Sequence, residues 1–504
     1  MSRVLATVAG LAIAGCAHSA TLLDRVKAQG ELVVITRNSP ATYYETAGGP
    51  KGFEYDLAKM FADRLGVSLR AITGKNFAEI VSRLNRREAD FAVGLPVTAT
   101  GKKLVRYSPP YQQNVSQVVY RISRSRPKTV RDLEGKVLEV VAGSAHVETL
   151  LDLRKEFPGL QWKENPELDR ADLMFMVWDE TIDYTLADAR EIALTRRYYP
   201  ELEGAFELGE PQRLAWAFAK HSDTSLFDAA VSFLQQAEKT GVLAQLEERY
   251  YGHTENLGYV DMRTFLAHIE QRLPRYRSLF EEAETSLGLD WRLLAAMGYQ
   301  ESQWDPAAVS PTGVRGIMML THATAALLGV RNRVDPRESI LGGARYLDMI
   351  RQKIPERIPE PDRTWLALAA YNVGLGHLQD ARLLTKKRGG DPDRWIDVKK
   401  NLPLLAQKQW YQQTRNGYAR GHEPVLYVEN VRNFYDVLQW ATAGEAQENS
   451  DGEQAASTEL QELSLMEREE GCRTRPASGA PGKTLSAAFR TPPPAGLPTT
   501  PLCG

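Results

Sequence analysis

The sequence WRLLAAMGYQESQWDPAAVSPTGVRGIMMLT, residues 291–321, opens with a pattern typical of an amphipathic helix. Asp290, just before it, is a good N-cap. Small and apolar residues then recur at helical spacing, at Trp291, Leu294, Ala295 and Gly298. The helix must end before Pro306, because the residue before a proline avoids the α region. The sequence therefore predicts a helix over 291–303.

Glu301 continues the apolar face of this helix, following Met297 and Gly298. Burial disfavours its anion, and the negative end of the helix dipole repels it, so we expect a raised pKa. A carboxylic acid that stays protonated near neutral pH can act as a general acid. A glutamate at a helix end can equally reach solvent and have no such role, and the helix alone does not decide between the two.

Three further motifs follow the Glu301-Ser302 pair. They are Ser310-Pro311-Thr312-Gly313, Gly316-Ile317-Met318-Met319-Leu320-Thr321 and Ala370-Tyr371-Asn372-Val373-Gly374. In this order they resemble the soluble lytic transglycosylase domain, which has a goose-type lysozyme fold. With the rest of the chain, the resemblance narrows to lytic murein transglycosylases of the membrane-bound F type.

The resemblance implies an enzyme that cleaves the β-1,4 bond between MurNAc and GlcNAc in peptidoglycan glycan strands without water. Glu301 would protonate the leaving oxygen. As a carboxylate it would then take the proton of the muramoyl 6-hydroxyl, which closes a 1,6-anhydro ring. Glycosidases usually need two carboxylates, whereas the motifs here supply one. A hydrolysing lysozyme is the alternative, and it should show a second carboxylate near the cleft.

The same resemblance assigns supporting roles to five residues around the acid. Ser310 would polarise the substrate acetamido group or ring, and Ser302 would cap the helix end. Tyr371 would orient the acid or contact substrate, and Asn372 would hold the local backbone. Met319 stands where the family commonly has Gln, which puts the preference of one sugar subsite in doubt. Core packing with a hydrogen-bonded hydroxyl is the alternative for Tyr371.

Composition sets broad limits on the class of protein. A chain of 504 residues is too long for one core, and its net charge of −2 gives no electrostatic case for nucleic acid. The three cysteines, Cys16, Cys472 and Cys503, leave the body of the chain without a disulfide framework or a thiolate metal site. We predict no metal and no cofactor.

Residues 1–20 resemble a secretory signal, with basic Arg3 before a short apolar run. Ile13-Ala14-Gly15-Cys16 resembles a bacterial lipobox, in which Cys16 becomes the lipid-bearing N-terminus. Because Ala17 rather than Asp follows, the resemblance implies the inner leaflet of the outer membrane, facing the periplasm. Ordinary cleavage after Ser19 or Ala20 is the alternative. Either route places the mature protein outside the cytoplasm.

Residues 27–252 alternate between strand and helix patterns, which favours α/β layers with largely parallel pairing. Strands are expected at 31–36, 90–94, 138–141 and 216–219, and a helix at 53–62. The motifs Gly52-Phe53-Glu54-Tyr55-Asp56-Leu57 and Arg106-Tyr107-Ser108-Pro109-Pro110-Tyr111 resemble the amino-acid-binding family of periplasmic solute-binding proteins. The resemblance implies two lobes around a ligand cleft, joined by strands that cross near 115–125 and 205–215.

One position departs from that family. An arginine usually precedes the aromatic residue of the second motif by six positions and clamps a ligand carboxylate, but Gly101 stands there. Lys102 is adjacent, although lysine lacks the planar fork of arginine. Asp188 matches the carboxylate that binds a ligand ammonium. We therefore expect a peptide or muropeptide rather than a free amino acid, or else an empty structural cleft.

The expected fold class is multidomain. A two-lobed α/β domain over 27–252, with a regulatory role, is followed by a connector over 253–262. A mostly α, lysozyme-like catalytic domain follows over 263–440, and residues 441–504 have the composition of a disordered tail. The alternative function is a periplasmic solute or muropeptide receptor whose helical domain only docks on murein. The Glu301 motif set favours the enzyme, and we expect closure of the cleft to alter access to Glu301.

Overall fold

The computed structural model describes residues 20–442, except 38, 40, 47–48, 222, 255–258 and 311–312. The predicted signal segment up to residue 19, all three cysteines and residues 443–504 of the predicted tail lie outside the described residues. Among the helices that are described, none is long and apolar enough to cross a membrane.

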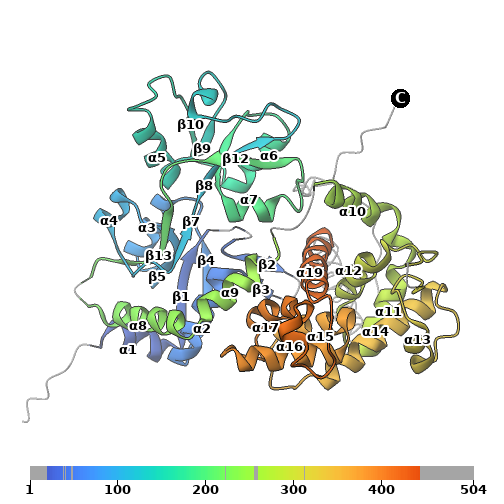
Figure 1. Cartoon of the computed structure of the whole chain (residues 1–504). Coiled ribbons are helices and arrows are strands. Elements are labelled where there is room, and N and C mark those ends of the chain that lie inside the picture. The colour runs from blue at the N-terminus through green and yellow to red at the C-terminus, as the bar shows by residue number, and fades with distance from the viewer. Residues whose placement is uncertain are drawn as a thin grey trace, which may run out of the picture. The chain divides into compact units, whose positions relative to one another are not determined.

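The first lobe is built on a mixed sheet of order β4-β1-β5-β13-β6, with β7 also paired to β13 (Figure 1). The parallel strands are β1 (Glu31–Thr36), β4 (Ser68–Thr73) and β5 (Phe91–Pro96). The strand β13 (Gln212–Ala219) runs antiparallel to β5, β6 (Val105–Tyr107) and β7 (Gln112–Asn114). A small antiparallel pair consists of β2 (Tyr44–Thr46) and β3 (Gly49–Lys51).

The helices of this lobe are α1 (Leu22–Gln29), α2 (Phe53–Leu65), α3 (Phe77–Asn85), α4 (Ala99–Leu104), α8 (Ser225–Lys239) and α9 (Val242–Tyr251). Apolar faces of α2 and α8 pack on the sheet around the buried aromatics Phe61, Phe91 and Trp216. The predicted strand at 31–36 has the same bounds as β1, and the predicted helix at 53–62 is confirmed as α2.

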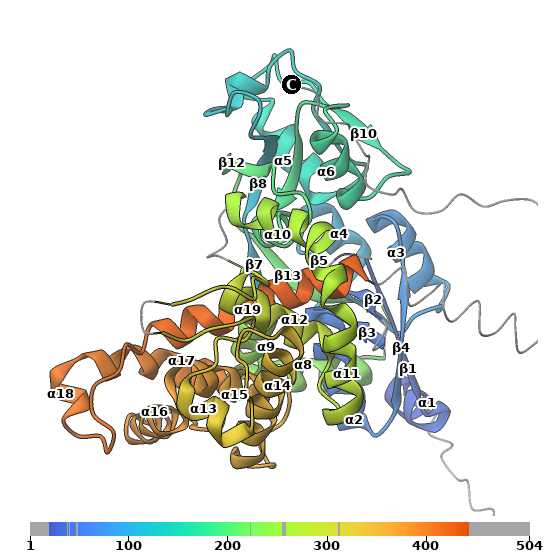
Figure 2. The same ribbon diagram turned by 90° about the vertical axis from the view of Figure 1, so that its right-hand side faces the viewer.

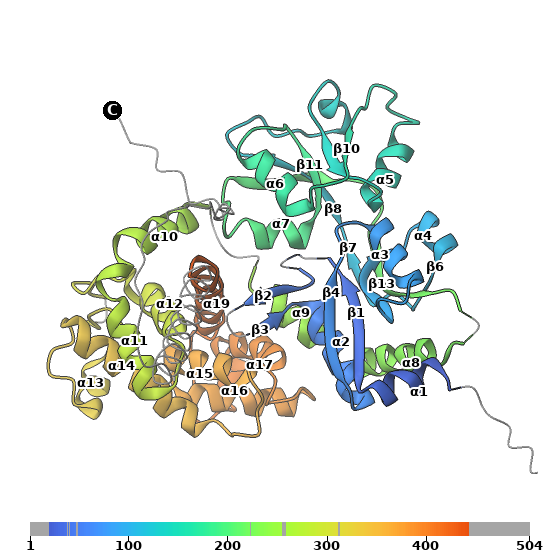
Figure 3. The same cartoon turned by 180° about the vertical axis from the view of Figure 1, so that it is seen from behind.

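The second lobe has a three-stranded sheet in which β8 (Ser116–Arg121) lies between β11 (Thr185–Asp188) and β12 (Leu202–Glu207). Figure 3 labels β8 and β11 of this sheet. A parallel pair, β9 (Glu139–Val141) and β10 (Lys163–Asn165), accompanies α5 (Ala145–Leu153), α6 (Arg170–Trp178) and α7 (Ala189–Thr195). The expectation of largely parallel pairing is wrong for this sheet. The chain enters the lobe along β8 and leaves along its neighbour β12, so these two strands must run in opposite directions.

Residues after 258 form helices. They are α10 (Tyr259–Gln271), α11 (Arg277–Leu287), α12 (Trp291–Ser302), α13 (His322–Leu328), α14 (Pro336–Lys353), α15 (Asp362–Val373), α16 (Leu375–Lys387), α17 (Trp395–Asn401), α18 (Lys408–Tyr411) and α19 (Glu423–Ala441). One contiguous apolar core holds them together, and α19 packs against both α12 and α15 (Figure 2).

The central helix α12 ends slightly before the predicted position. Its N-terminus is capped as expected, since the Asp290 side chain accepts a hydrogen bond from the Arg292 amide. At the other end, Gln303 and Trp304 have positive φ angles of 52° and 58°, a region that residues with a Cβ seldom adopt. The Trp304 indole is buried and donates to the Ala295 carbonyl at 2.8 Å, which stabilises this turn. The helix therefore presents Glu301 on its last turn.

Candidate active site

Glu301 is only partly exposed, and burial raises the pKa of its carboxyl to about 7. The raised pKa predicted from the apolar helix face is therefore confirmed, with burial as the dominant cause. An acid with this pKa is about half protonated at neutral pH, so it can give up a proton and accept one back.

Tyr427 on α19 is the group that interacts directly with this carboxyl. Its hydroxyl lies near Glu301 and opposes part of the rise in the Glu301 pKa. The hydroxyl is buried, and no described group lies at the distance and angle of a hydrogen bond to it. Sequence reasoning missed Tyr427, although a hydroxyl on the same helix face as buried Val431 and Phe434 was an available signal.

Tyr371 lies beside the acid but directs its hydroxyl elsewhere. It donates to the Met318 carbonyl at 3.0 Å, and its ring stacks on that of Tyr427 with centroids 6.4 Å apart. Burial and the nearby Glu301 carboxylate raise the pKa of Tyr371 well above its ordinary value. Asn372 is exposed, and its role in holding the local backbone stays a prediction.

Ser302, Ser310 and Met319 occupy the loop side of the site. The Ser302 hydroxyl contacts the carbonyls of Gly298 and Ile317 at 3.1 and 2.9 Å, so it joins the helix end to the following loop. The Ser310 side chain accepts a hydrogen bond from the Val314 amide at 3.2 Å. Met319 is partly exposed and has a φ angle of 45°, an uncommon conformation of the kind that clusters at functional sites.

The charges around Glu301 are as informative as its hydrogen bonds. Burial raises the pKa of Glu301, and the Tyr427 hydroxyl partly opposes that rise. A retaining or inverting hydrolase places its second carboxyl within about 5–9.5 Å of the first. Glu301 is the acid-base group of this candidate site, and Tyr371 and Tyr427 lie near it. Within the described residues, no cluster of three or more His, Cys, Asp or Glu side chains is placed to hold a metal ion.

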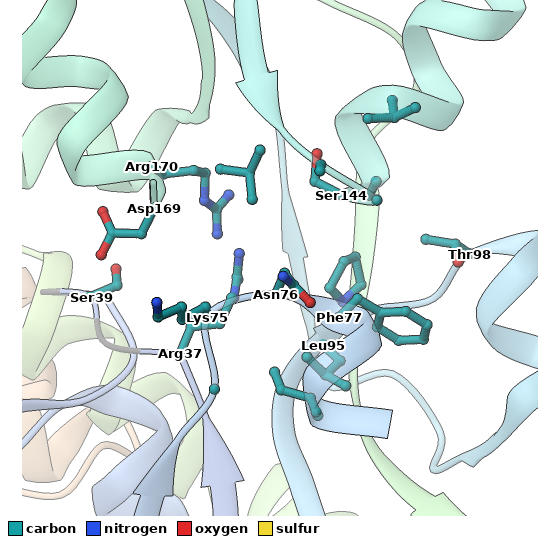
Figure 4. A pocket seen from close by; sticks show the side chains of 18 of the residues that line it. Arg37, Ser39, Lys75, Asn76, Phe77, Leu95, Thr98, Ser144, Asp169 and Arg170 are labelled. Atoms are coloured by element: carbon teal, nitrogen blue, oxygen red, sulfur yellow. The ribbon is translucent and has the colours of Figure 1, made fainter. Parts of the chain in front are cut away.

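A second candidate site lies in the α/β part of the chain, between its two lobes. This pocket encloses about 440 Å³ (Figure 4). One part of its lining is charged or polar, with Arg37, Ser39, Lys75, Asp169, Arg170 and Glu191; another is apolar, with Phe77, Ile80, Leu95, Val147 and Leu151. Arg170 and Asp169 face Lys75 and Arg37 across the pocket.

Steric crowding explains why glycine, and not the arginine usual in the solute-binding family, stands at position 101. A Cβ added at this position would lie 2.1 Å from the Tyr107 hydroxyl oxygen, so no side chain fits. That hydroxyl donates to the Pro96 carbonyl at 3.0 Å and so is fixed in place. The volume next to Gly101 is therefore already filled by Tyr107, and an arginine clamp could not be restored by substituting Gly101 alone.

Neither of the two candidate ligand-binding residues, Lys102 and Asp188, lines the interlobe pocket. Asp188 is buried, accepts from Arg170 at 2.8 Å, and borders a small side cavity rather than the large pocket. Its charge is already balanced inside the protein, which makes it a poor receptor for a ligand ammonium. Lys102 lines a different, basic pocket on the first lobe. Lys102 does not line the interlobe pocket, so its role in ligand binding stays a prediction.

Two family models match two separate parts of the chain. The model of the family of bacterial extracellular solute-binding proteins, family 3, matches residues 32–253, and the transglycosylase SLT domain model matches residues 278–393. Among solved structures, holo ArgBP from T. maritima aligns with a TM-score of 0.39 and 25% identity, covering 45% of this chain and 99% of that one.

Curated relatives match nearly the whole chain. The membrane-bound lytic murein transglycosylase F of Pseudomonas fluorescens strain Pf-5 is 48% identical over 452 residues, which is 89% of this chain and 92% of that protein. The protein of the same name from Ectopseudomonas mendocina is 50% identical over 436 residues, which is 86% of this chain and 89% of that protein. With a raised-pKa glutamate in a transglycosylase domain, the chain belongs to the membrane-bound lytic murein transglycosylase F family and is a peptidoglycan-cleaving lytic transglycosylase.

Proposed function

We propose that Glu301 alone serves as acid and then as base in a non-hydrolytic cleavage of the MurNAc–GlcNAc bond. The protonated carboxyl gives its proton to the glycosidic oxygen as the bond to C1 breaks. The resulting carboxylate takes the proton of the muramoyl 6-hydroxyl, whose oxygen bonds to C1 and closes the 1,6-anhydro ring. The enzyme returns to its starting protonation state without consuming water.

The observation that carries this proposal is the single carboxyl with a pKa of about 7. A group that must first donate and then accept a proton works best when its pKa is near the working pH. Tyr427 would steady the carboxylate in the second half of the reaction, and Tyr371 would keep the Met318 carbonyl and the following Met319 in place. Ser310 and Met319 are proposed to contact substrate from the loop.

The proposal is tested on purified murein sacculi by mass spectrometry of the released sugars. Wild type should release muropeptides that end in 1,6-anhydromuramic acid, each lighter by one water than a hydrolysis product. Glu301→Gln should release none. Glu270→Gln, an exposed glutamate on α10 without an ion pair in the described chain, is the matched control and should behave as wild type. Reducing-end products from wild type would contradict the proposal.

We also propose boundaries and a location for this activity. The solute-binding part spans 27–252 and has a regulatory role, and the catalytic part spans 263–440. A lipid on Cys16 would tether the chain to the inner leaflet of the outer membrane, facing the murein of the periplasm. Metabolic labelling with a radioactive or alkyne-bearing fatty acid tests the anchor, since Cys16→Ser should abolish label on the chain.

The interlobe pocket is proposed to take a peptide or muropeptide. Its volume of about 440 Å³ exceeds what a single amino acid fills, and its lining combines charged side chains of both signs with an apolar wall. Thermal unfolding with a murein tetrapeptide, compared with free amino acids, tests this assignment. A rise in melting temperature with the peptide that Lys75→Glu reduces would support it. A response to no peptide would favour the empty structural cleft.

A further inference from the structure

A second pocket of about 540 Å³ lies on the first lobe and is lined by four cations from different elements. They are Lys102 on α4, Arg106 on β6, Arg213 on β13 and Lys220 just after β13. No acidic residue lines the pocket, and none of the four forms an ion pair within the described part of the chain. The protein as a whole carries a net charge of only −2, so this local positive charge is not a general property of its surface.

Two of the cations are held in position by the backbone. Lys220 Nζ donates to the backbone carbonyls of Lys102 and Lys103, each at 2.9 Å. Both residues lie in the last turn of α4. Arg106 donates to the His221 carbonyl at 3.3 Å and lies over the Phe227 ring. These contacts fix the direction of the side chains but leave their charges uncompensated. A preformed group of cations of this kind suits a phosphate, which arginine and lysine both bind well.

The start of the folded chain is attached beside the same pocket. The Leu22 amide donates to the Asp223 carboxylate and the Leu23 amide donates to the Ser225 hydroxyl, so α1 is fixed to the start of α8. Figure 1 shows α1 lying along α8. The other Asp223 oxygen accepts from the Ser225 amide, so this carboxylate is occupied by backbone groups. Lys220 and His221 lie only two to three residues away from Asp223 in the same connection.

The tether limits how far this lobe can be from a membrane. Five residues lie between Cys16 and Leu22, and the six steps from one to the other span at most about 20 Å when the chain is extended. If Cys16 carries the lipid, as proposed above, the segment beside the basic pocket must stay close to the phospholipid surface. The tether lets the lobe reach the surface, and anionic headgroups attract lysine and arginine once these come within about 10 Å, the screening length at 0.1 M ionic strength.

We propose that the pocket formed by Lys102, Arg106, Arg213 and Lys220 binds the phosphate of an anionic phospholipid in the anchoring membrane. This inference rests on the proposed anchor at Cys16. Binding would fix the orientation of the first lobe on the membrane, beyond what a flexible tether provides. The pocket would take a phosphodiester headgroup such as that of phosphatidylglycerol, with its two non-bridging oxygens directed at the cations.

The test is co-sedimentation of the mature chain from Ala17 onward, which lacks both the leader and the lipidated cysteine. Vesicles of phosphatidylethanolamine with 30% phosphatidylglycerol are compared with vesicles of phosphatidylethanolamine and phosphatidylcholine. We expect binding at least tenfold stronger to the anionic vesicles at low salt, and its loss in 0.5 M NaCl. Lys102→Glu with Arg213→Glu should weaken that binding at least tenfold. Neither side chain has a hydrogen-bond partner in the described chain, so folding should be preserved.

A matched control carries the same change of charge on the other lobe. Lys128→Glu with Lys136→Glu alters two exposed lysines that form no ion pair among described residues, and it should bind vesicles as wild type does. Equal loss in both double variants would overturn the proposal, because the attraction would then follow net charge alone. Unchanged binding by Lys102→Glu with Arg213→Glu would also overturn it. The neutral pair Lys102→Gln with Arg213→Gln replaces the charge reversal if that variant does not fold.

One further measurement distinguishes a lipid phosphate from a soluble phosphate. Another distinguishes the membrane-binding proposal from the proposed catalytic role of Glu301. If inorganic phosphate raises the melting temperature of wild type but vesicles do not bind, the pocket is a site for a soluble anion and the membrane assignment is overturned. Release of anhydro sugars from isolated sacculi should be unchanged in Lys102→Glu with Arg213→Glu. Vesicle binding should be unchanged in Glu301→Gln. Failure of one proposal therefore leaves a clear result for the other.

Discussion

The hydroxyl of Tyr427 on α19 faces the carboxyl of Glu301 on α12, and it lowers a pKa that burial would otherwise raise further. This relationship joins two helices that are far apart in sequence but pack closely in the helical core. It gives Glu301 two opposing influences. The apolar surroundings favour the acid needed for the first proton transfer, and the hydroxyl favours the carboxylate needed for the second.

Tyr427→Phe is therefore expected to raise the pKa of Glu301 above about 7, since it removes a donor that stabilises the anion. The descending limb of the kcat/KM profile against pH should move to higher pH. Activity at pH 6 should fall about tenfold, the cost of losing one hydrogen bond to a charged group. The profile is measured from the release of anhydro sugars at pH 5 to 9. A loss of activity with the limb unmoved would indicate a merely structural role.

Glu301→Gln should change stability in a pH-dependent way. The folded pKa of about 7 exceeds the ordinary value of 4.5, so native Glu301 opposes folding increasingly as pH rises from 4.5 to 7, and fully above 7. Glutamine removes this penalty. The variant should be more stable than wild type by on the order of 1–3 kcal/mol at pH 8 and nearly equal to it at pH 4. Urea unfolding at pH 4 and pH 8 measures the difference in stability between Glu301→Gln and wild type. Glu270→Gln should show no such pH-dependent difference.

The buried ion pairs of Arg170 give a prediction about the second lobe. Arg170 contacts Asp188 at 2.8 Å and Glu191 at 3.1 Å; both carboxylates are buried, and the Arg170 side chain is only 10% exposed. Arg170→Met leaves two carboxylates without their cation and should destabilise the protein by about 3–5 kcal/mol. Adding Asp188→Asn and Glu191→Gln should recover most of that loss. If the single variant unfolds at the same urea concentration as wild type, Arg170 does not have this role.

Gly101 and Tyr107 should show strong energetic coupling. Gly101→Ala places a methyl group 2.1 Å from the Tyr107 hydroxyl oxygen and should cost roughly 1–3 kcal/mol of stability. Tyr107→Phe removes that oxygen and should rescue much of the loss in the double variant. Additive effects in a double-mutant cycle would argue against the close contact.

Local patterns predicted much of the fold. The bounds of β1 are those expected, because a buried β-branched run is a local signal. Glu301 was found for the same reason, since its apolar face can be read along one helix. The mixed direction of the strands could not be read in this way, because it depends on which strands the chain uses to cross between lobes.

The remaining misses all concern partners that lie on a different helix or strand. Tyr427 reaches Glu301 only because α19 packs on α12, and Arg170 neutralises Asp188 only because α6 lies against β11. The Tyr107 hydroxyl fills the position next to Gly101 across the end of α4. A motif identifies the residue type at a position, but the charge or volume that meets it there is set by tertiary packing.

The most direct test of a one-carboxylate, water-free cleavage is digestion of sacculi in water enriched in oxygen-18. Because the 6-hydroxyl attacks C1, the account predicts anhydro products that carry no heavy oxygen at the new muramic end. Parallel digestion by a hydrolysing lysozyme should give fully labelled reducing ends. One heavy oxygen at the muramic end of the products of this protein would show that water is the nucleophile, and would contradict the assignment of Glu301 as both acid and base.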